Sequence, residues 1–283
     1  MTAQQPELLS LRRVKWNERA LARLKGSRIL LLVVQIALLL AVLSGYSLLL
    51  IADPDLRRFM PTLPELLQAF QTIATNPVFW RDLGVTLSAA GLGLVISLII
   101  GGVIGLLLST HRNAYRSGQF LIDFMRTIPP LALIPVGLLL LGPNVRMEIT
   151  LIVISAVWPV LLQTYFATTN VDKKLLETGR SYRMPLWRRL LFIMIPAIGP
   201  SFATAVRLSA TLCLLLAIGT ELLATSSGLG YLVAWYQQAG KIPETYAVVI
   251  VIGLLGVAIN GILISAERRL FSWRELDGEA AKS

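Results

Sequence analysis

Few side chains in this sequence could carry out chemistry, and their spacing assembles neither a catalytic group nor a metal site. The chain has one cysteine, Cys213, which stands in an apolar run, and one histidine, His111. A lone cysteine can form neither an internal disulfide nor a cysteine metal cluster. Catalysis would need a nucleophile beside a base, or a cluster of metal ligands. We therefore expect a protein that is not an enzyme and that binds no metal or cofactor.

Two ionisable side chains lie inside one apolar run, Leu191–Leu223, where burial makes a charge costly. Because a helix rises about 1.5 Å per residue, Arg207 and Glu221 would stand about 21 Å apart, too far to pair with each other. Arg207 could attract an anionic substrate. It could instead fix the packing by pairing with another helix, for example through Asp123. The sequence leaves both interpretations of Arg207 open.

The apolar runs that must position these residues are typical of a membrane protein. The 283 residues are 55% hydrophobic and 15% charged, whereas an average soluble domain is about 25% charged. An apolar helix of about 20 residues is long enough to cross the hydrocarbon core of a bilayer. We therefore predict an all-α, polytopic membrane protein with six spans: Ile29–Ile51, Leu83–Leu108, Leu121–Leu141, Ile149–Ala167, Leu191–Leu223 and Ala247–Ala266.

The net charge of +10 is distributed in a way that predicts the orientation of these spans. If the N-terminus is cytoplasmic, most lysines and arginines fall on the cytoplasmic side, as the positive-inside rule requires. Six spans then return the C-terminus to that side. We therefore expect a cytoplasmic arm at 1–28, a transmembrane domain at 29–266 and a cytoplasmic tail at 267–283. The charge then reflects topology and lipid contact rather than nucleic-acid binding.

Three prolines interrupt the third predicted span in the segment RTIPPLALIP, Arg126–Pro135. Proline lacks a backbone N–H and disfavours helix in the residue before it, so this span cannot be a regular helix at Pro129. Irregular backbone survives at membrane depth only where protein or a water-filled cavity surrounds it. The segment is therefore either a kink beside a transport pathway or a purely structural kink.

Two further local patterns predict packing. In the second span, Gly101 and Gly105 form a GxxxG face that allows a neighbouring helix to approach closely. In the preceding outer loop, MPTLPELLQAF predicts a short helix with Glu65 in its first turn.

A basic, amphipathic segment, Asp172–Leu190, separates the fourth and fifth spans on the cytoplasmic side. Pro185 pushes Met184 out of the helical region, so we predict two short helices joined by a bend. The segment could lie in the lipid headgroups as an interfacial helix, or it could dock into a groove of a cytoplasmic partner. Its apolar residues recur at helical spacing and would share one face: Leu175, Gly179, Tyr182, Leu186 and Leu190.

These motifs resemble those of a known family. Glu177 to Arg180 (ETGR), followed by Ile195-Pro196, looks like the EAA motif of permease subunits of bacterial ABC importers. TELLATSSGLGYLV, Thr220–Val233, is similar to AEML-SSGLGYLI in the branch that carries sulfonates, taurine and nitrate, and IPPLALIP and WRRLLFIMIP also match. The family motif usually has two alanines after the glutamate and a glycine four residues beyond them. This sequence departs from it at Thr178, Gly179 and Arg183.

The resemblance implies an all-α, type I importer permease in which Asp172–Leu190 is a coupling helix seated in a separate ATPase subunit. The sequence has no GxxxxGK[ST] loop to cradle nucleotide phosphates, which independently requires that any ATP be hydrolysed by a partner. The residues expected to contact or shape the ATPase interface are Leu175, Glu177, Thr178, Gly179, Arg180, Tyr182, Arg183, Pro185, Leu186 and Trp187.

The resemblance further implies a substrate path and an outer gate, where Glu221 would pair or cap. The expected partners are cytoplasmic ATPase subunits, a second permease copy (identical or paralogous), an extracytoplasmic binding protein and the lipid of the bacterial inner membrane. The substrate would be a small organic anion or related nutrient. A secondary transporter with an interfacial helix is the alternative, although such transporters usually show inverted repeats. The path and gate residues are Thr127, Pro129, Pro130, Arg207, Glu221, Ser226, Ser227, Gly228 and Tyr231.

Overall fold

The computed structural model describes residues 56–110, 112–224 and 227–271. The chain divides into two compact units, Met1–Thr62 and Leu63–Ser283. In the first unit, the described residues include one short 3-10 helix, η1 (Leu56–Arg58). The predicted arm at 1–28 and the first predicted span, Ile29–Ile51, lie outside the described residues. So does the predicted tail after residue 271.

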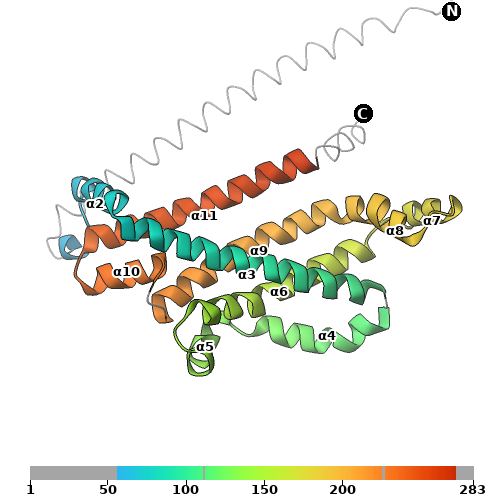
Figure 1. Ribbon diagram of the computed structural model, residues 1–283, viewed down its shortest axis with the longest axis horizontal. Coiled ribbons are helices and arrows are strands. Elements are labelled where there is room, and N and C mark those ends of the chain that lie inside the picture. Colours follow the sequence, from blue (N-terminus) through green and yellow to red (C-terminus); the bar gives the residue numbers. More distant parts are fainter. Residues whose placement is uncertain (1–55, 111, 225–226, 272–283) are drawn as a thin grey trace, which may run out of the picture. The chain divides into compact units, whose positions relative to one another are not determined.

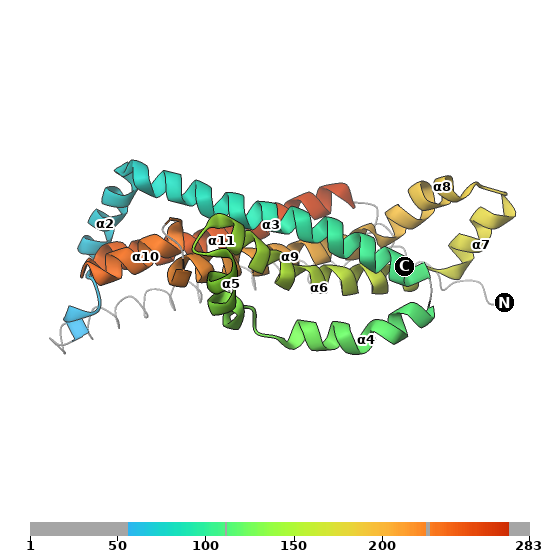
Figure 2. The same ribbon diagram turned by 60° about the horizontal axis from the view of Figure 1, so that its bottom comes forward.

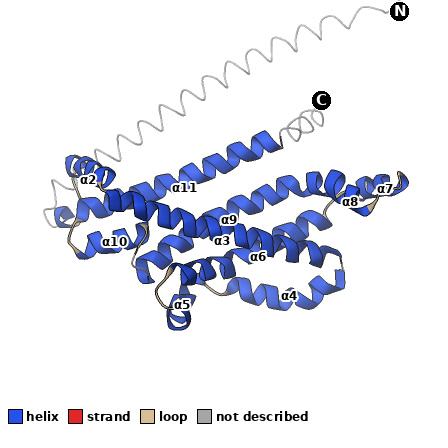
Figure 3. Ribbon diagram, viewed as in Figure 1, coloured by secondary structure: helices blue, strands red, loops and turns tan. Residues whose placement is uncertain are grey.

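The described part of the second unit is helical, with no strand (Figure 3). An 81° bend separates the helix that ends at Thr127 from the two short helices that together span Pro130–Leu141. The kink predicted from the prolines is therefore confirmed. Figure 1 shows the elements: α2 (Leu63–Thr75), α3 (Pro77–Thr110), α4 (Arg112–Thr127), η2 (Pro130–Leu133), α5 (Ile134–Leu141), α6 (Val145–Thr169), α7 (Lys173–Ser181), α8 (Leu186–Arg189), η3 (Leu190–Met194, a π-helical turn), α9 (Ile195–Ala224), α10 (Leu229–Gln238) and α11 (Ile242–Leu270).

Four long stretches in the described residues are apolar enough to cross a membrane, and a fifth is added if the bent segment counts as one span. The four are α3, α6, the stretch Trp187–Gln238 that contains α9, and α11; the fifth is α4 with η2 and α5. These coincide with the predicted second to sixth spans. The chain is therefore a multi-pass helical membrane protein, and a count of six depends on Ile29–Ile51.

The small residues of α3 bring α6 against it, as the GxxxG pattern predicts. A Cβ added to Gly101 would lie 2.7 Å from the carbonyl oxygen of Val157, and one added to Gly93 would overlap the side chain of Ile152. Such close approach stabilises helix pairs in lipid, where association depends on van der Waals contact. Cys213 of α9 is fully buried against these two helices, so its thiol packs as a core side chain.

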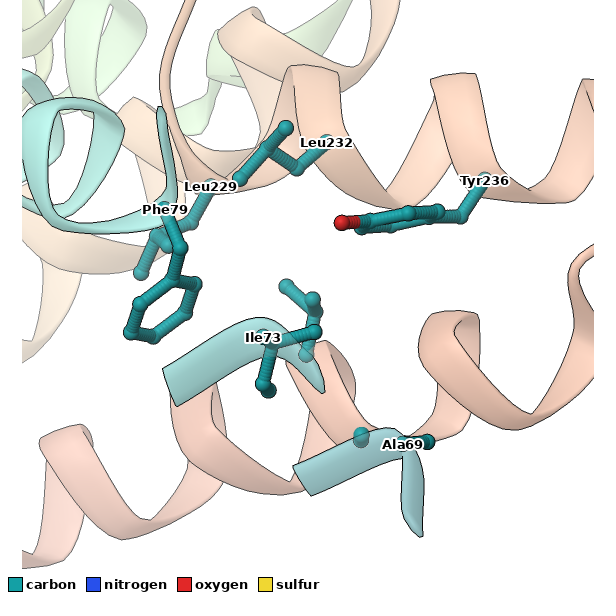
Figure 4. Packing of buried hydrophobic residues seen from close by; sticks show 8 residues of the cluster. Ala69, Ile73, Phe79, Leu229, Leu232 and Tyr236 are labelled. Carbon is teal, nitrogen blue, oxygen red and sulfur yellow. The ribbon is translucent and has the colours of Figure 1, made fainter. Parts of the chain in front are cut away.

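A second apolar cluster joins α2, α10 and α11, away from α7 and α8 (Figures 1 and 4). Pro64 lies in the first turn of α2 and Glu65 follows it, as predicted from MPTLPELLQAF. Ile73 of α2 is nearly inaccessible and lies between α10 and α11. The short helices at this end are thereby packed into the domain. The cluster comprises Ala69, Ile73, Phe79, Leu229, Leu232, Tyr236, Ala247 and Val248.

Candidate functional site

The first candidate site is the segment formed by α7 and α8, which projects from the ends of α6 and α9 (Figure 2). Asp172 caps α7, because its carboxylate accepts a hydrogen bond of 2.9 Å from the backbone N–H of Lys174. Two short helices separated by a bend were predicted from Pro185, and the structure confirms them. Glu177 is exposed and forms no ion pair with the described side chains.

The bend after α7 is a Schellman motif, the commonest way to end a helix. The N–H of Arg183 donates to the carbonyl oxygen of Arg180 at 2.9 Å, and the N–H of Met184 donates to that of Gly179 at 3.1 Å. Arg183 occupies the left-handed position, with φ of +48°, and is the one non-glycine residue with positive φ in the described ranges. Glycine is preferred there because it has no Cβ. The bend that a glycine would favour is therefore formed here by an arginine.

Gly179 is buried, and the reason is its contact with the following turn. A Cβ at this position would lie 2.6 Å from Cδ1 of Ile193 and 3.2 Å from Cδ of Arg189. Gly179 thus lets α7 dock on η3, whereas Leu175 and Tyr182, which the helical spacing groups with it, remain exposed. Those two side chains are 49% and 78% exposed.

The exposed surface of the segment combines apolar and basic side chains. Trp187 is 55% exposed, and the guanidinium of Arg188 lies 5.1 Å from the centre of its ring. Thr178 donates a hydrogen bond to the carbonyl oxygen of Lys174, and Arg180 is exposed. The structure does not describe the side chains of Leu186 and Leu190. Leu175, Tyr182 and Trp187 therefore form the exposed apolar part of this surface, which we call the α7–α8 surface.

The second candidate site surrounds Glu221, near the end of α9. Its carboxylate is buried and accepts hydrogen bonds of 2.9 Å from the hydroxyl of Thr86 on α3 and from the N–H of Gly230 in the first turn of α10. The same hydroxyl accepts a 2.9 Å hydrogen bond from the N–H of Leu229. Glu221 therefore caps α10, in keeping with the pairing or capping expected of it, and ties α3, α9 and α10 together.

The turn before α10 explains the glycines of the SSGLG stretch. Gly228 has a φ of +106°, and an added Cβ would overlap the carboxyl group of Glu221. A Cβ at Gly230 would overlap the carbonyl oxygen of Ile218. Ser227 and Tyr231 flank this turn and are half-buried, whereas Ser226 lies outside the described residues. The glycines thus allow α10 to fold back onto α9.

Two further buried carboxylates lie near Glu221, and sequence reasoning did not identify them. Asp82 is fully buried and pairs with Arg81 at 2.9 Å. Glu148, in the first turn of α6, is also fully buried, and neither of its carboxylate oxygens finds a hydrogen-bond donor among the described residues. Their acidic character next to the long apolar runs is the signal that could have drawn attention to them.

The third candidate site is a cavity of about 620 Å³ between the bent third span, α6 and α9. Thr127 and Pro130, predicted to line a path, are brought together there, whereas Pro129 is not among the lining residues. Prolines from both the bend and α6 contribute to its wall. The lining comprises Arg126, Thr127, Pro130, Leu131, Ser155, Trp158, Pro159, Leu162, Leu212, Leu215 and Leu216.

Arg207 does not line this cavity. Its guanidinium lies 3.7 Å from the Oε2 atom of Glu267 on α11, so the helix-pairing interpretation is the one that the structure bears out. The partner suggested from the sequence was wrong, because Asp123 pairs with Arg126 at 3.2 Å on its own helix. An i, i+3 pair on one helix needs no tertiary contact and forms more readily than a pair between distant helices. Arg126, which the sequence analysis did not single out, is the arginine of the cavity.

No group of three or more histidine, cysteine, aspartate or glutamate side chains in the described ranges is placed to hold a metal ion. The three buried carboxylates are therefore not arranged as a metal site. The features on which a function can be argued are the α7–α8 surface, the capped turn at Glu221 and the cavity beside Arg126.

Comparison with curated proteins places these features in a known context. The chain is 26% identical over 215 residues to a putative aliphatic sulfonates transport permease protein, SsuC, of Bacillus subtilis, covering 76% of this chain and 78% of the relative. It is 23% identical over 186 residues to the nitrate import permease protein NrtB of Leptolyngbya laminosa, covering 66% of each. These proteins are thus similar over most of their length.

Comparison with solved structures supports the same fold. A bacterial ABC transporter involved in the import of the acidic polysaccharide alginate matches with a TM-score of 0.62 at 13% identity, over 80% of this chain and 96% of the other. Residues 93–272, more than half of the chain, match the family described as binding-protein-dependent transport system inner membrane component. The chain belongs to the family of binding-protein-dependent transport system inner membrane components.

Proposed function

We propose that this chain is the permease subunit of an ATP-driven importer in the bacterial inner membrane, with both termini in the cytoplasm. It forms the translocation path with a second copy of itself or with a paralogue. An extracytoplasmic binding protein delivers the substrate, and a separate cytoplasmic subunit hydrolyses ATP. By analogy with the sulfonate and nitrate permeases to which the chain is similar, the substrate is a small anion.

The observation that carries this proposal is the α7–α8 surface. Leu175, Tyr182 and Trp187 expose about half or more of their side chains on a segment that also presents arginines. Large apolar side chains left exposed on a projecting helical segment mark sites where a partner docks. Most of the exposed charges on this segment are basic, so the matching groove of the ATPase would carry acidic side chains.

The segment also connects the proposed ATPase interface to the helices that line the cavity. It lies between α6, which helps to line the cavity, and α9, which does the same. The Schellman motif and the contact between Gly179 and Ile193 fix α7 relative to η3. When two ATPase subunits approach each other, a rigid unit of this kind moves with them and shifts the helices that it joins. Alternating access would follow from that movement.

At the other end of α9, Glu221 holds α10 against α3 and α9. With the orientation set by the basic residues, this end faces the outside, so α10 and its turn would form the outer gate. A binding protein would dock there. Ser227 and Tyr231 flank the same turn and complete the described part of the proposed gate, to which the sequence motif also assigns Ser226.

The proposal is tested by co-purification of the tagged chain with the ATPase encoded beside it. Tyr182→Asp places a charge on the most exposed aromatic residue of the surface and should abolish recovery of the ATPase. Phe59→Asp, at an exposed aromatic residue outside the predicted spans, is the matched control and should leave recovery unchanged. If wild type recovers no ATPase, or both variants recover it equally, the segment is an interfacial helix and the secondary-transporter alternative is preferred.

A further inference from the structure

We propose that the cavity beside Arg126 binds the transported compound, and that this compound is an organic anion with an apolar body rather than a small inorganic anion. The guanidinium of Arg126 would hold the anionic group, while Trp158 and the leucines of α9 would cover the body. This inference rests on the proposed function and assigns its substrate contact to residues of this chain.

The position of Arg126 is the first step. It lies just before the 81° bend, near the middle of the segment 115–141, whose two halves are together long and apolar enough to cross a membrane. Its side chain is 52% exposed, and that of its partner Asp123 is 43% exposed. Half-exposed charges at this depth cannot face hydrocarbon, because an ionised side chain there is strongly destabilising. The face of α4 that carries them must therefore border a watery path or the second permease copy.

The hydrogen-bonding capacity of Arg126 is the second step. Nε lies 3.2 Å from Oδ1 of Asp123, which forms the ion pair. A guanidinium has five N–H donors in a planar fork, so one such contact leaves donors on the two terminal nitrogens. That fork matches the paired oxygens of a sulfonate or carboxylate. Asp123 orients the arginine and, at the same time, competes with any incoming anion for its charge.

The rest of the lining is apolar, which is the third step. The hydroxyls of Thr127 and Ser155 donate to the carbonyl oxygens of Phe124 and Leu151 in their own helices, at 2.7 and 2.8 Å. They therefore add no hydroxyl donor to the cavity. Its other walls are mainly proline, tryptophan and leucine side chains.

This lining discriminates between kinds of anion. A small inorganic anion needs hydrogen bonds on every side to replace its water, and besides Arg126 these walls offer only the indole N–H of Trp158 as a side-chain donor. An alkyl or aryl body, in contrast, gains free energy by leaving water for such walls. The volume of about 620 Å³ lies within the range of roughly 300–1,000 Å³ that is typical of pockets for small organic molecules.

A polar stripe leads away from the cavity along α4. Arg116, Gln119, Asp123 and Thr127 follow each other at steps of three and four residues, which places them on one side of a helix. Exposed phenylalanines stand beside this stripe at Phe120 and Phe124. The stripe runs towards the start of α4, at the same end of the domain as α7, so a released anion would leave along it into the cytoplasm.

The test uses the permease–ATPase complex in nanodiscs and measures binding of methanesulfonate, butanesulfonate, hexanesulfonate and nitrate by equilibrium dialysis. Affinity should rise along the alkyl series, and nitrate should bind weakest. Arg126→Gln should weaken hexanesulfonate binding roughly 10- to 100-fold, because a charge-assisted pair is lost. Arg146→Gln, at an exposed arginine outside the cavity, is the matched control and should leave binding unchanged.

A second variant changes binding in the opposite direction. Asp123→Asn removes the competing carboxylate and should tighten hexanesulfonate binding, whereas a purely structural role for the pair predicts no gain. The inference is overturned if nitrate binds as tightly as hexanesulfonate, if hexanesulfonate does not bind, or if Arg126→Gln binds it as wild type does. Co-purification of the ATPase then separates the two proposals. If the ATPase is recovered with the variant, the proposed function stands and only the inference about the substrate fails. If wild type recovers no ATPase, the proposed function itself is contradicted.

Discussion

Thr86 and Glu221, separated by 135 positions in the sequence, share a buried hydrogen bond of 2.9 Å between the hydroxyl and the carboxylate. The oxygen of Thr86 also accepts a hydrogen bond from the N–H of Leu229, so one side chain serves α3, α9 and α10 at once. A threonine is the residue type suited to this position because a hydroxyl both donates and accepts. The short helix α10 is thereby joined to the long helices that form the body of the domain.

Thr86→Val keeps the shape of the side chain and removes both hydrogen bonds. It leaves the N–H of Leu229 buried without an acceptor and removes one of the two hydrogen bonds to Oε2 of Glu221, which should destabilise the fold by about 1–3 kcal/mol. The apparent melting temperature in nanodiscs should fall by several degrees. Thr72→Val is the control, because that exposed hydroxyl donates within its own helix to Gln68. Equal melting temperatures for the two variants would contradict the role given to Thr86.

Gly228→Ala tests whether the turn before α10 requires glycine for space as well as for its backbone. Gly228 and Gly240 both have positive φ, but an added Cβ at Gly228 would overlap the carboxyl group of Glu221, whereas nothing lies within 4 Å of one at Gly240. Gly240→Ala should therefore show the backbone strain alone, about 1 kcal/mol. Gly228→Ala should lower the melting temperature further and reduce transport in proteoliposomes. If Gly240→Ala is the more damaging of the two, the carboxyl group of Glu221 does not fill the space beside Gly228.

Arg183→Gly should stabilise the bend between α7 and α8. Arg183 is held at a φ of +48°, where a Cβ is unfavourable, and glycine would relieve about 0.5–1 kcal/mol. The relief is local, so it should appear as slower hydrogen exchange, by roughly two- to five-fold, at the amides of Arg183 and Met184 that close the Schellman motif. Arg180→Gly, inside α7, should instead speed exchange. Unchanged exchange in Arg183→Gly would indicate that the arginine is not strained.

The elements that were predicted well are those with a strong local signal. The apolar runs predicted α3, α6, α9 and α11, the prolines predicted the bend after Thr127, and the glycines of α3 predicted its contact with α6. Each of these follows from residues close together in the sequence. The first predicted span, Ile29–Ile51, is not tested, since it lies outside the described residues.

The features that were missed depend on contacts between distant segments. Thr86 gave no signal, because its partners are 135 and 143 residues away. Arg207 was considered as a substrate contact and Arg126 was not. Spacing along the chain does not reveal that Arg207 pairs with Glu267 on a neighbouring helix, whereas Arg126 lines the cavity. Gly179 was grouped with Leu175 and Tyr182 by helical periodicity, which does not reveal the close approach of Ile193. Side-chain roles of this kind are fixed by packing rather than by local pattern.

Gly179→Ala would restore an alanine that the related motif usually has, yet it should impair coupling in this chain. Its Cβ would lie 2.6 Å from Cδ1 of Ile193, which would push α7 away from η3. Ile193→Val removes that Cδ1 atom, so the double variant should recover what the single variant loses. Substrate-stimulated ATP hydrolysis by the reconstituted complex measures this: it should fall in Gly179→Ala, stay near wild type in Ile193→Val and return in the double variant. If the double variant instead loses at least as much activity as Gly179→Ala, the effect of Gly179 lies at the ATPase interface. One substitution compensates for another only where the two residues pack directly against each other.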